Sequence, residues 1–196
     1  MKLRPISVEI LRDHNTPDVA VELAVRALRS LDPILDNGLS IVDSGRIEPV
    51  SVPGSTIVDT DNIPRLDIRA DFGIIMTHNE LTVRPEKSKK IIRENTILAG
   101  MAYSRGKNRP YGIIDANQSG VPEHIVTHEF GHLLRIKHGG EYYDGESHCT
   151  IDECNMYPVS SGHNGAFCQE CAHHTASNFH SLRRKKSSLF GRYLFY

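Results

Sequence analysis

Val126-Thr127-His128-Glu129-Phe130-Gly131-His132-Leu133-Leu134 is the stretch around which the rest of the sequence can be interpreted. It contains a His-Glu-x-x-His pattern, in which two imidazoles stand four residues apart and a carboxylate follows the first. Residues i and i+4 lie one turn apart on the same face of an α-helix, so both imidazoles can reach one metal ion. Glu129 is then placed near the remaining coordination position, where it can take a proton from a water molecule.

Apolar residues surround this polar trio and predict that the helix is buried on its other faces. They are Ile125, Val126, Phe130, Leu133 and Leu134. Pro122-Glu123 is a typical helix start, and we expect the helix to span about residues 121–137. Two histidines and a glutamate are costly to bury without a function, which favours a metal-binding role over a purely structural one.

The composition is that of a globular domain. The 196 residues are 39% hydrophobic and 24% charged, with a formal net charge of -1, which fits a single domain spanning residues 1–196. The near-zero charge argues against nucleic acid or a membrane as a partner. The first ten residues lack the apolar core of a secretion signal, and no segment is long and apolar enough to span a membrane. We therefore expect a cytoplasmic protein.

All four cysteines lie late in the chain, at Cys149, Cys154, Cys168 and Cys171. In a reducing compartment metal binding is favoured over disulfides, and the Cys-x4-Cys and Cys-x-x-Cys pairs suit a tetrahedral zinc site with four thiolate ligands. Two disulfides are the alternative for an exported protein.

The remaining sequence predicts a mixed α/β fold, a sheet covered by helices. Alternating or continuous apolar runs predict strands at residues 3–11, 39–42, 47–52, 72–77, 97–104 and 111–115. Asp43-Ser44-Gly45 is interpreted as the turn of a hairpin. Thr16-Pro17-Asp18 is interpreted as the cap and first residues of a helix that stops at Asp32-Pro33.

Two further helices are expected, at residues 86–95 and from Cys168 to about Arg184. The run Arg183-Arg184-Lys185-Lys186 then closes the last helix, where basic residues complement the helix dipole.

A catalytic zinc usually has three protein ligands, and two histidines are candidates for the third. His138 continues the pattern as His-Glu-x-x-His-x-x-Arg-x-x-His, but Arg135 stands where glycine would let the helix break in a left-handed conformation. If the helix instead runs on to Gly139-Gly140, His138 lies off the ligand face. His148 is the rival, and Cys149 follows it directly.

The string His148-Cys149-Thr150-Ile151-Asp152-Glu153-Cys154-Asn155-Met156 reads His-Cys-x4-Cys-x-Met. Together with His-Glu-x-x-His and the later Cys-x-x-Cys, it resembles the archaemetzincins, which are zinc metallopeptidases of the metzincin clan. The resemblance covers about residues 123–172. It implies that the four cysteines hold a second, structural zinc and that Met156 forms the turn beneath the catalytic zinc.

The sequence departs from this family in two places. The interval from Met156 to Cys168 is shorter, and ten additional residues lie between His132 and Cys149. Placing them before Gly145 aligns Gly145, His148 and Cys149 with the family's glycine, third histidine and first cysteine. We therefore favour His148 as the third ligand, with His138 as the alternative.

The resemblance implies an active-site helix within residues 1–138, followed in residues 139–196 by the Met-turn, the four-cysteine zinc subdomain and a C-terminal helix. It implies two zinc ions per chain, a peptide or protein substrate and Glu129 as general base, in an enzyme of endopeptidase or aminopeptidase type. A strand at residues 97–104 is the expected edge for an extended substrate. The alternatives are a zinc-stabilised binding module that contacts nucleic acid and a catalytically inactive scaffold.

Overall fold

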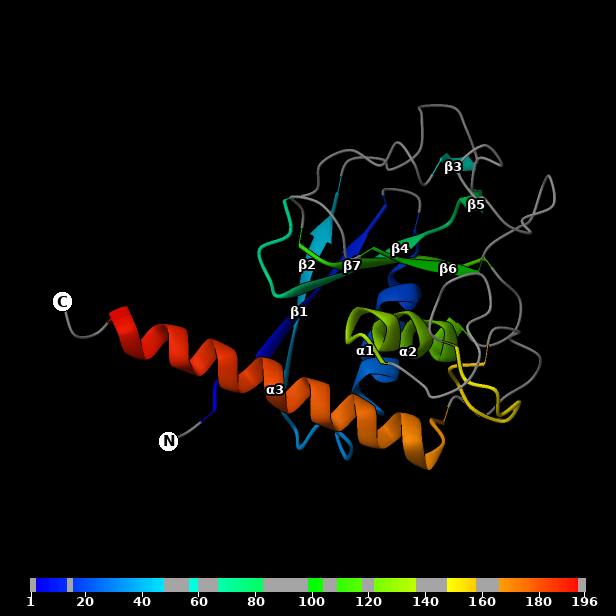
Figure 1. Ribbon diagram of the computed structural model, residues 1–196. Coiled ribbons are helices and arrows are strands. Elements are labelled where there is room, and N and C mark those ends of the chain that lie inside the picture. The colour runs from blue at the N-terminus through cyan, green and yellow to red at the C-terminus, as the bar shows by residue number, and fades with distance from the viewer. Residues whose placement is uncertain are drawn as a thin grey trace.

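The computed structural model of the chain describes residues 3–13, 16–47, 57–59, 67–82, 99–103, 109–117, 122–136, 148–157 and 166–193. Within these residues it is a mixed α/β fold, which confirms the predicted class (Figure 1). The predicted helix at residues 86–95 lies outside the described residues, as does His138.

The main sheet has five strands in the described part of the chain, in the order β2-β1-β4-β7-β6. Their bounds are Ile6–Arg12 for β1, Leu39–Arg46 for β2, Phe72–Thr77 for β4, Gly100–Tyr103 for β6 and Tyr111–Asp115 for β7. The first four strands of this order are parallel, and β6 pairs with β7 in the antiparallel sense at one edge. A separate pair joins β3 (Ile57–Asp59) to β5 (Glu80–Thr82), and neither strand was predicted.

Both faces of the central strands are covered, because helices cross one face and the segment at residues 67–70 crosses the other. All residues of β4 and β7 are buried, as expected for parallel strands between two layers. In β1 even Glu9 is buried, and its carboxylate accepts hydrogen bonds from the backbone amides of Arg69 and Ala70. The alternation of Ile6, Val8 and Ile10 with polar residues predicts a half-buried strand, and for β1 that prediction is wrong.

The predicted hairpin at residues 39–52 is also wrong in its described part. β2 runs through Asp43-Ser44-Gly45 as one strand, parallel to β1. Ile10 and Arg12 of β1 pair with Asp43 and Arg46 of β2, so β2 has one more residue than β1 between these two pairs. The turn-like residues of β2 therefore form a β-bulge. Gly45 has a φ of +82° there, and its amide donates to the Asp43 carboxylate. The same local signals serve a bulge and a turn, and sequence alone did not separate them.

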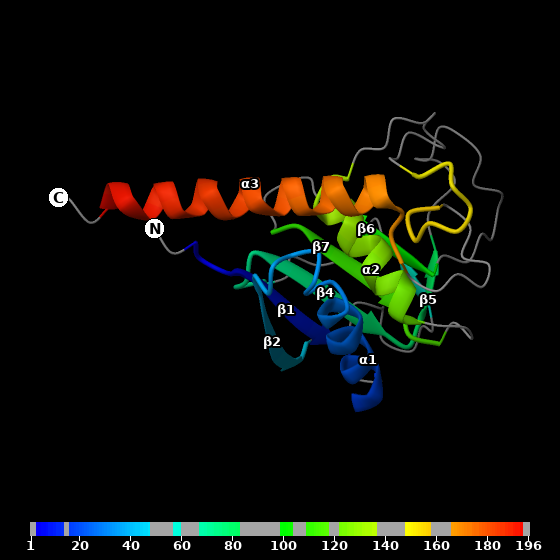
Figure 2. The same ribbon diagram turned by 90° about the horizontal axis from the view of Figure 1, so that it is seen from below.

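Two helices, α1 (Asp18–Arg29) and α2 (Pro122–Leu133), lie side by side on one face of the sheet (Figure 2). Between them and the sheet is the larger part of the hydrophobic core, in which Phe130 meets Phe72 edge-on at 5.7 Å between ring centroids. Helix α1 was predicted correctly, but its cap was not. Pro17 is the N-cap residue, and the Thr16 hydroxyl donates to the carbonyl of Met76 instead.

Helix α2 ends at Leu133, four residues before the predicted end at 137. Arg135 has a φ of +56°, the left-handed conformation that the sequence argument assigned to glycine at this position. For a residue with a Cβ this costs roughly 1–2 kcal/mol. The Asn178 side-chain amide donates to the carbonyls of Leu134 and Arg135, so contacts with the last helix offset that cost.

That last helix, α3, spans Gln169–Tyr193 and continues past the predicted end at about Arg184. Its last turns extend away from the sheet (Figure 1). The basic run therefore does not cap the helix, contrary to the prediction. Arg183 donates to the carbonyls of Leu3 and Arg4, and Lys186 pairs with Asp71. No helix among the described residues is long and apolar enough to cross a membrane.

Candidate metal centres

Three imidazoles from distant parts of the chain meet above helix α2. His128 and His132 project from the same face of α2, with 3.0 Å between their Nε2 atoms. His148 comes from the segment at residues 148–157, and its ring centroid lies 5.4 Å from that of His128 and 4.9 Å from that of His132. One ring nitrogen from each residue falls within a group no wider than 4.8 Å. The three side chains could therefore hold one metal ion, and we call them the histidine group.

His128 and His132 of the histidine group have lowered pKa values that suit metal binding at neutral pH. Burial lowers the pKa of His128 to about 4, against a hydrogen bond from its ring to the Asn155 backbone that raises it. Burial, followed by the neighbouring His128 and His148, lowers the pKa of His132 to about 2. Both rings are therefore neutral near pH 7, which is the form that binds a metal.

Glu129 lies beside the histidine group and is buried. A glycine in each of β6 and β7 provides its space. A Cβ built on Gly100 of β6 would lie 2.9 Å from Oε1 of Glu129, and one built on Gly112 of β7 would lie 3.4 Å from its Cβ. The carboxylate thus stands between α2 and the edge of the sheet. In this position it is adjacent to the imidazoles without being one of the three grouped donors.

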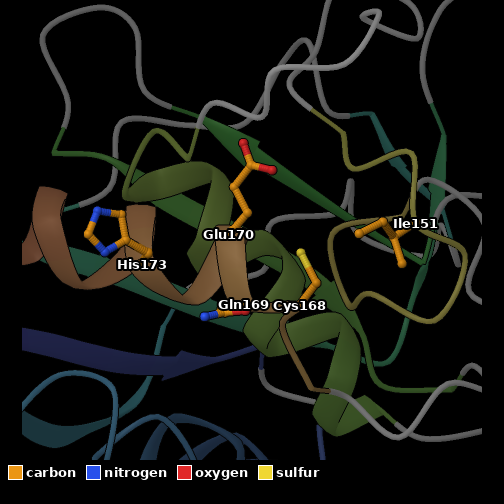
Figure 3. Close-up of a pocket in the computed structure, with 5 residues that line it drawn as sticks. All are labelled: Ile151, Cys168, Gln169, Glu170 and His173. Carbon is orange, nitrogen blue, oxygen red and sulfur yellow. The ribbon is translucent and has the colours of Figure 1, made fainter.

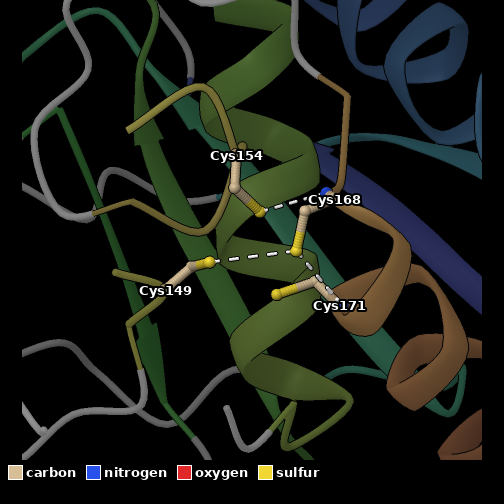
Figure 4. A group of neighbouring side chains, drawn as sticks. All are labelled: Cys149, Cys154, Cys168 and Cys171. Atoms are coloured by element: carbon tan, nitrogen blue, oxygen red, sulfur yellow. Dashed lines mark hydrogen bonds between the residues drawn. The ribbon is translucent and has the colours of Figure 1, made fainter. Parts of the chain in front are cut away.

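The four cysteines form a second candidate centre, which we call the cysteine group. Cys149 and Cys154 come from the segment at residues 148–157, whereas Cys168 directly precedes α3 and Cys171 lies in its first turn (Figure 4). Their Sγ atoms all lie within 4.8 Å of one another. No disulfide joins any of these cysteines, all of which lie in the described residues. Four sulfurs converging on one point suit a tetrahedral metal, so the geometry favours metal binding over the disulfide alternative.

Hydrogen bonds already favour thiolate character in part of the cysteine group. The backbone amide of Cys168 donates to Sγ of Cys154 at 3.2 Å, and that of Ile151 donates to Sγ of Cys149 at 3.4 Å. The hydrogen bond from the Cys171 thiol is the main cause that lowers the pKa of Cys154 to about 5, and the same bond raises the pKa of Cys171. Burial raises the pKa of Cys149 to about 12. Bringing all four to the thiolate form therefore needs a cation among them.

Met156 packs against helix α2 and is fully buried. A Cβ built on Gly131 of α2 would come within 2.5 Å of its Sδ atom, so any larger residue at this position would require Met156 or the helix to shift. The carbonyl of Met156 accepts a hydrogen bond of 2.8 Å from the amide of Cys149. The segment at residues 148–157 is therefore a closed loop that supports α2 from below.

A shallow cavity of about 410 Å³ lies on the outer side of the cysteine group, lined by Ile151, Cys168, Gln169, Glu170 and His173 (Figure 3). None of its lining residues belongs to the histidine group. His174, which has no place in the sequence pattern, lies 3.9 Å from the Glu170 carboxylate.

Sequence reasoning missed three residues that shape the histidine group. Gly100 and Gly131 were available as signals, since a glycine inside a strand or a helix often marks a close approach. Asn155, whose carbonyl lies 2.6 Å from Nδ1 of His128, carried no signal of its own. His148 is the candidate third ligand that the described structure places with His128 and His132.

No protein-family model matches the sequence, and no curated protein matches it either. Solved structures do match. The archaemetzincin of Methanopyrus kandleri has a TM-score of 0.63 at 13% identity, over 90% of this chain and 96% of that one. The archaemetzincin of Archaeoglobus fulgidus, solved with malonate, has a TM-score of 0.55 at 17% identity, over 85% and 99%.

A zinc-dependent peptidase of Methanocorpusculum labreanum is similar as well, with a TM-score of 0.53 at 17% identity over 86% of this chain and 99% of that chain. At these identities the likeness concerns the backbone, and it extends over almost the whole length of each structure. The chain has the fold of the archaemetzincins.

Proposed function

We propose that this chain is a zinc-dependent metallopeptidase. The observation that carries the proposal is the meeting of His128, His132 and His148 next to the buried carboxylate of Glu129. Three neutral imidazoles and a free position are the usual donor set of a catalytic zinc. The similar structures from three archaea, two archaemetzincins and one zinc-dependent peptidase, support the choice of reaction.

When bound, zinc supplies a Lewis acid that polarises the scissile carbonyl and lowers the pKa of a water molecule. The residues of the chain hold the ion and transfer the protons. The three imidazoles hold the ion, and Glu129 accepts the proton of the attacking water and then returns it to the leaving amine. Burial between α2 and strands β6 and β7 keeps the Glu129 carboxylate aimed at one place and excludes bulk water from its other side.

The substrate is expected to add along β6. This strand is the edge of the main sheet next to α2, and its first residue, Gly100, touches Glu129. An extended peptide pairing with the side of β6 that no described strand occupies would pass the carboxylate and the histidine group. Such pairing uses backbone hydrogen bonds, which any extended peptide can form.

The cysteine group is proposed to bind a second, structural zinc, giving two ions per chain. It joins the start of α3 to the segment that carries His148 and Met156, so the ion would fix the position of both. The nucleic-acid-binding alternative is less well supported, because Arg183 and Lys186 of the basic run are engaged within the domain. We also propose that the protein acts in the cytoplasm.

Zinc stoichiometry and peptide cleavage test the proposal. Wild-type protein is expected to hold two zinc ions, His148→Ala one, and His138→Ala two. The reverse pattern for the two variants would move the third ligand to His138. Glu129→Gln is expected to keep both zinc ions and to lose cleavage of a peptide library by about 100-fold or more. Cleavage that survives in Glu129→Gln, or wild-type protein that holds zinc and cleaves no peptide, contradicts the enzyme assignment.

A further inference from the structure

Three consecutive residues of the segment at residues 148–157 face the two candidate metal centres. Cys154 belongs to the cysteine group, and Met156 packs against Gly131 of α2, the residue before His132. Between them lies Asn155, which is buried and belongs to neither group of donors. Its backbone and side chain both bind helix α2, at the turn from which His128 projects.

The backbone contact determines which nitrogen of His128 is available for a metal. Nδ1 of His128 lies 2.6 Å from the carbonyl oxygen of Asn155. A carbonyl oxygen only accepts, so Nδ1 must carry the proton. In the neutral ring Nε2 then holds the lone pair, and Nε2 is the atom that faces His132. This contact selects the tautomer that can ligate and sets the plane of the ring.

The side-chain contact holds that carbonyl in place. The Asn155 amide donates to the hydroxyl of Thr127 at 2.6 Å, in a buried position. The Thr127 hydroxyl donates in turn to the carbonyl of His124, one turn earlier in α2, at 3.0 Å. Thr127 directly precedes His128, so the Asn155 carbonyl and the His128 ring are tied to the same turn of the helix. The backbone amide of Asn155 donates to Ala166 at 2.8 Å, which fixes the other side of the residue.

From these contacts we propose that Asn155 is a positioning residue for His128, and that its bond to Thr127 is the element that holds the tautomer-selecting carbonyl. The proposal rests on the proposed function in one respect, namely that the histidine group binds zinc. It assigns Asn155 no contact with substrate. It also connects the cysteine group to the first ligand of the histidine group, because Asn155 follows Cys154 in the chain and is hydrogen-bonded to His128.

The variants that test this remove the side-chain bond and leave the backbone carbonyl in the chain. Asn155→Ala deletes the amide, and Thr127→Val deletes the hydroxyl at nearly constant shape. Both are expected to weaken zinc binding at the histidine group by about 10- to 100-fold, the usual effect of losing a group that orients a ligand. Thr127→Ser keeps the hydroxyl and is expected to bind zinc within about threefold of the wild type.

The measurements are a zinc titration of the full-length protein against a competing chelator and nitrogen NMR of protein labelled at histidine. In wild-type protein the His128 signal should report a proton on Nδ1. In Asn155→Ala and Thr127→Val the Nδ1 signal should lose its fixed-tautomer character, which a general loss of stability does not cause. If Asn155→Ala does not fold, the comparison of Thr127→Val with Thr127→Ser carries the test alone.

Asn178→Ala is the matched control, because the Asn178 amide also donates to α2, but to the carbonyls of Leu134 and Arg135 at its end. It is expected to lower stability and leave the His128 tautomer unchanged. Wild-type zinc affinity and tautomer in both Asn155→Ala and Thr127→Val overturn the positioning role, as does an equal zinc loss in Asn178→Ala. Wild-type protein that binds no zinc at the histidine group overturns the proposed function itself.

Discussion

Gly131→Ala is expected to destabilise this protein, although alanine is the better helix former. Gly131 lies inside α2, one residue before His132. A Cβ at this position would lie 2.5 Å from Sδ of Met156, 3.3 Å from its Cε and 3.0 Å from Cδ1 of Ile136. Carbon and sulfur atoms in ordinary contact are more than about 3.5 Å apart, so α2 or Met156 must move by roughly 1 Å.

Two opposing effects determine the magnitude. Replacing glycine by alanine inside a helix stabilises by about 1 kcal/mol. Forcing an extra methyl group into a filled core costs about 1–3 kcal/mol. The expected result is a net loss of roughly 0–2 kcal/mol in the free energy of unfolding, and the melting temperature of a domain of this size falls by about 2–4 °C for each kcal/mol.

The assay is urea unfolding of Gly131→Ala in two backgrounds, at one fixed zinc concentration because a ligand of the native state changes apparent stability. In the Met156→Ala background the sulfur and the terminal methyl group are gone. There the same Gly131→Ala change should become stabilising, by up to about 1 kcal/mol. A Gly131→Ala effect that is equally unfavourable in both backgrounds refutes the reasoning that Met156 is what requires glycine.

Three further predictions concern the two centres. Gly100→Ala should displace the Glu129 carboxylate, since the new Cβ would lie 2.9 Å from its Oε1 atom. As a result kcat/KM for peptide cleavage should fall on the order of 100-fold while the zinc content stays unchanged. Loss of zinc in this variant would contradict the prediction. Cys168→Ala should retain one zinc per chain and unfold at a lower urea concentration, and a variant with both ions and full stability would disprove the structural role of the cysteine group. Zinc-free protein should lose stability as the pH falls from about 6.5 towards 4. Burial lowers the pKa of His128 to about 4 and that of His132 to about 2, so the unfolded chain takes up protons in this range that the folded state does not. Each imidazole contributes up to about 1.4 kcal/mol per pH unit, and a flat profile of urea midpoints over this range would contradict the prediction.

Local sequence patterns predicted much of the fold. The apolar run at Phe72–Thr77 and the amphipathic repeat of Asp18–Arg29 predicted β4 and α1, because each encodes its own period and its own burial. The bulge at Asp43-Ser44-Gly45 was mistaken for a turn, since a glycine with positive φ serves both. The end of α3 was also missed, because the partners of Arg183 and Lys186 lie near the start of the chain and at Asp71.

The end of α2 likewise depends on tertiary contacts as well as on the local sequence. Sequence reasoning placed a left-handed residue at position 135 only for the case in which His138 is the ligand, judged Arg135 unfavourable there, and expected the helix to run on to about residue 137. The structure nevertheless breaks the helix at Arg135, with Asn178 of α3 bonded to the carbonyls that the break exposes. A contact made across more than forty residues compensates a local cost, and local propensity cannot report it.

The sequence by itself determined which donor side chains are available at both candidate metal centres. His128, Glu129 and His132 share a helix face by spacing alone, and the cysteine pairs have the intervals of a metal site. Only the tertiary structure decided that His148 joins the two helical imidazoles, that Gly100 and Gly131 leave room for Glu129 and Met156, and that Asn155 orients His128. The physical reason is that donor type and helical period are properties of short segments, whereas these contacts arise where the segment at residues 148–157 returns beneath α2.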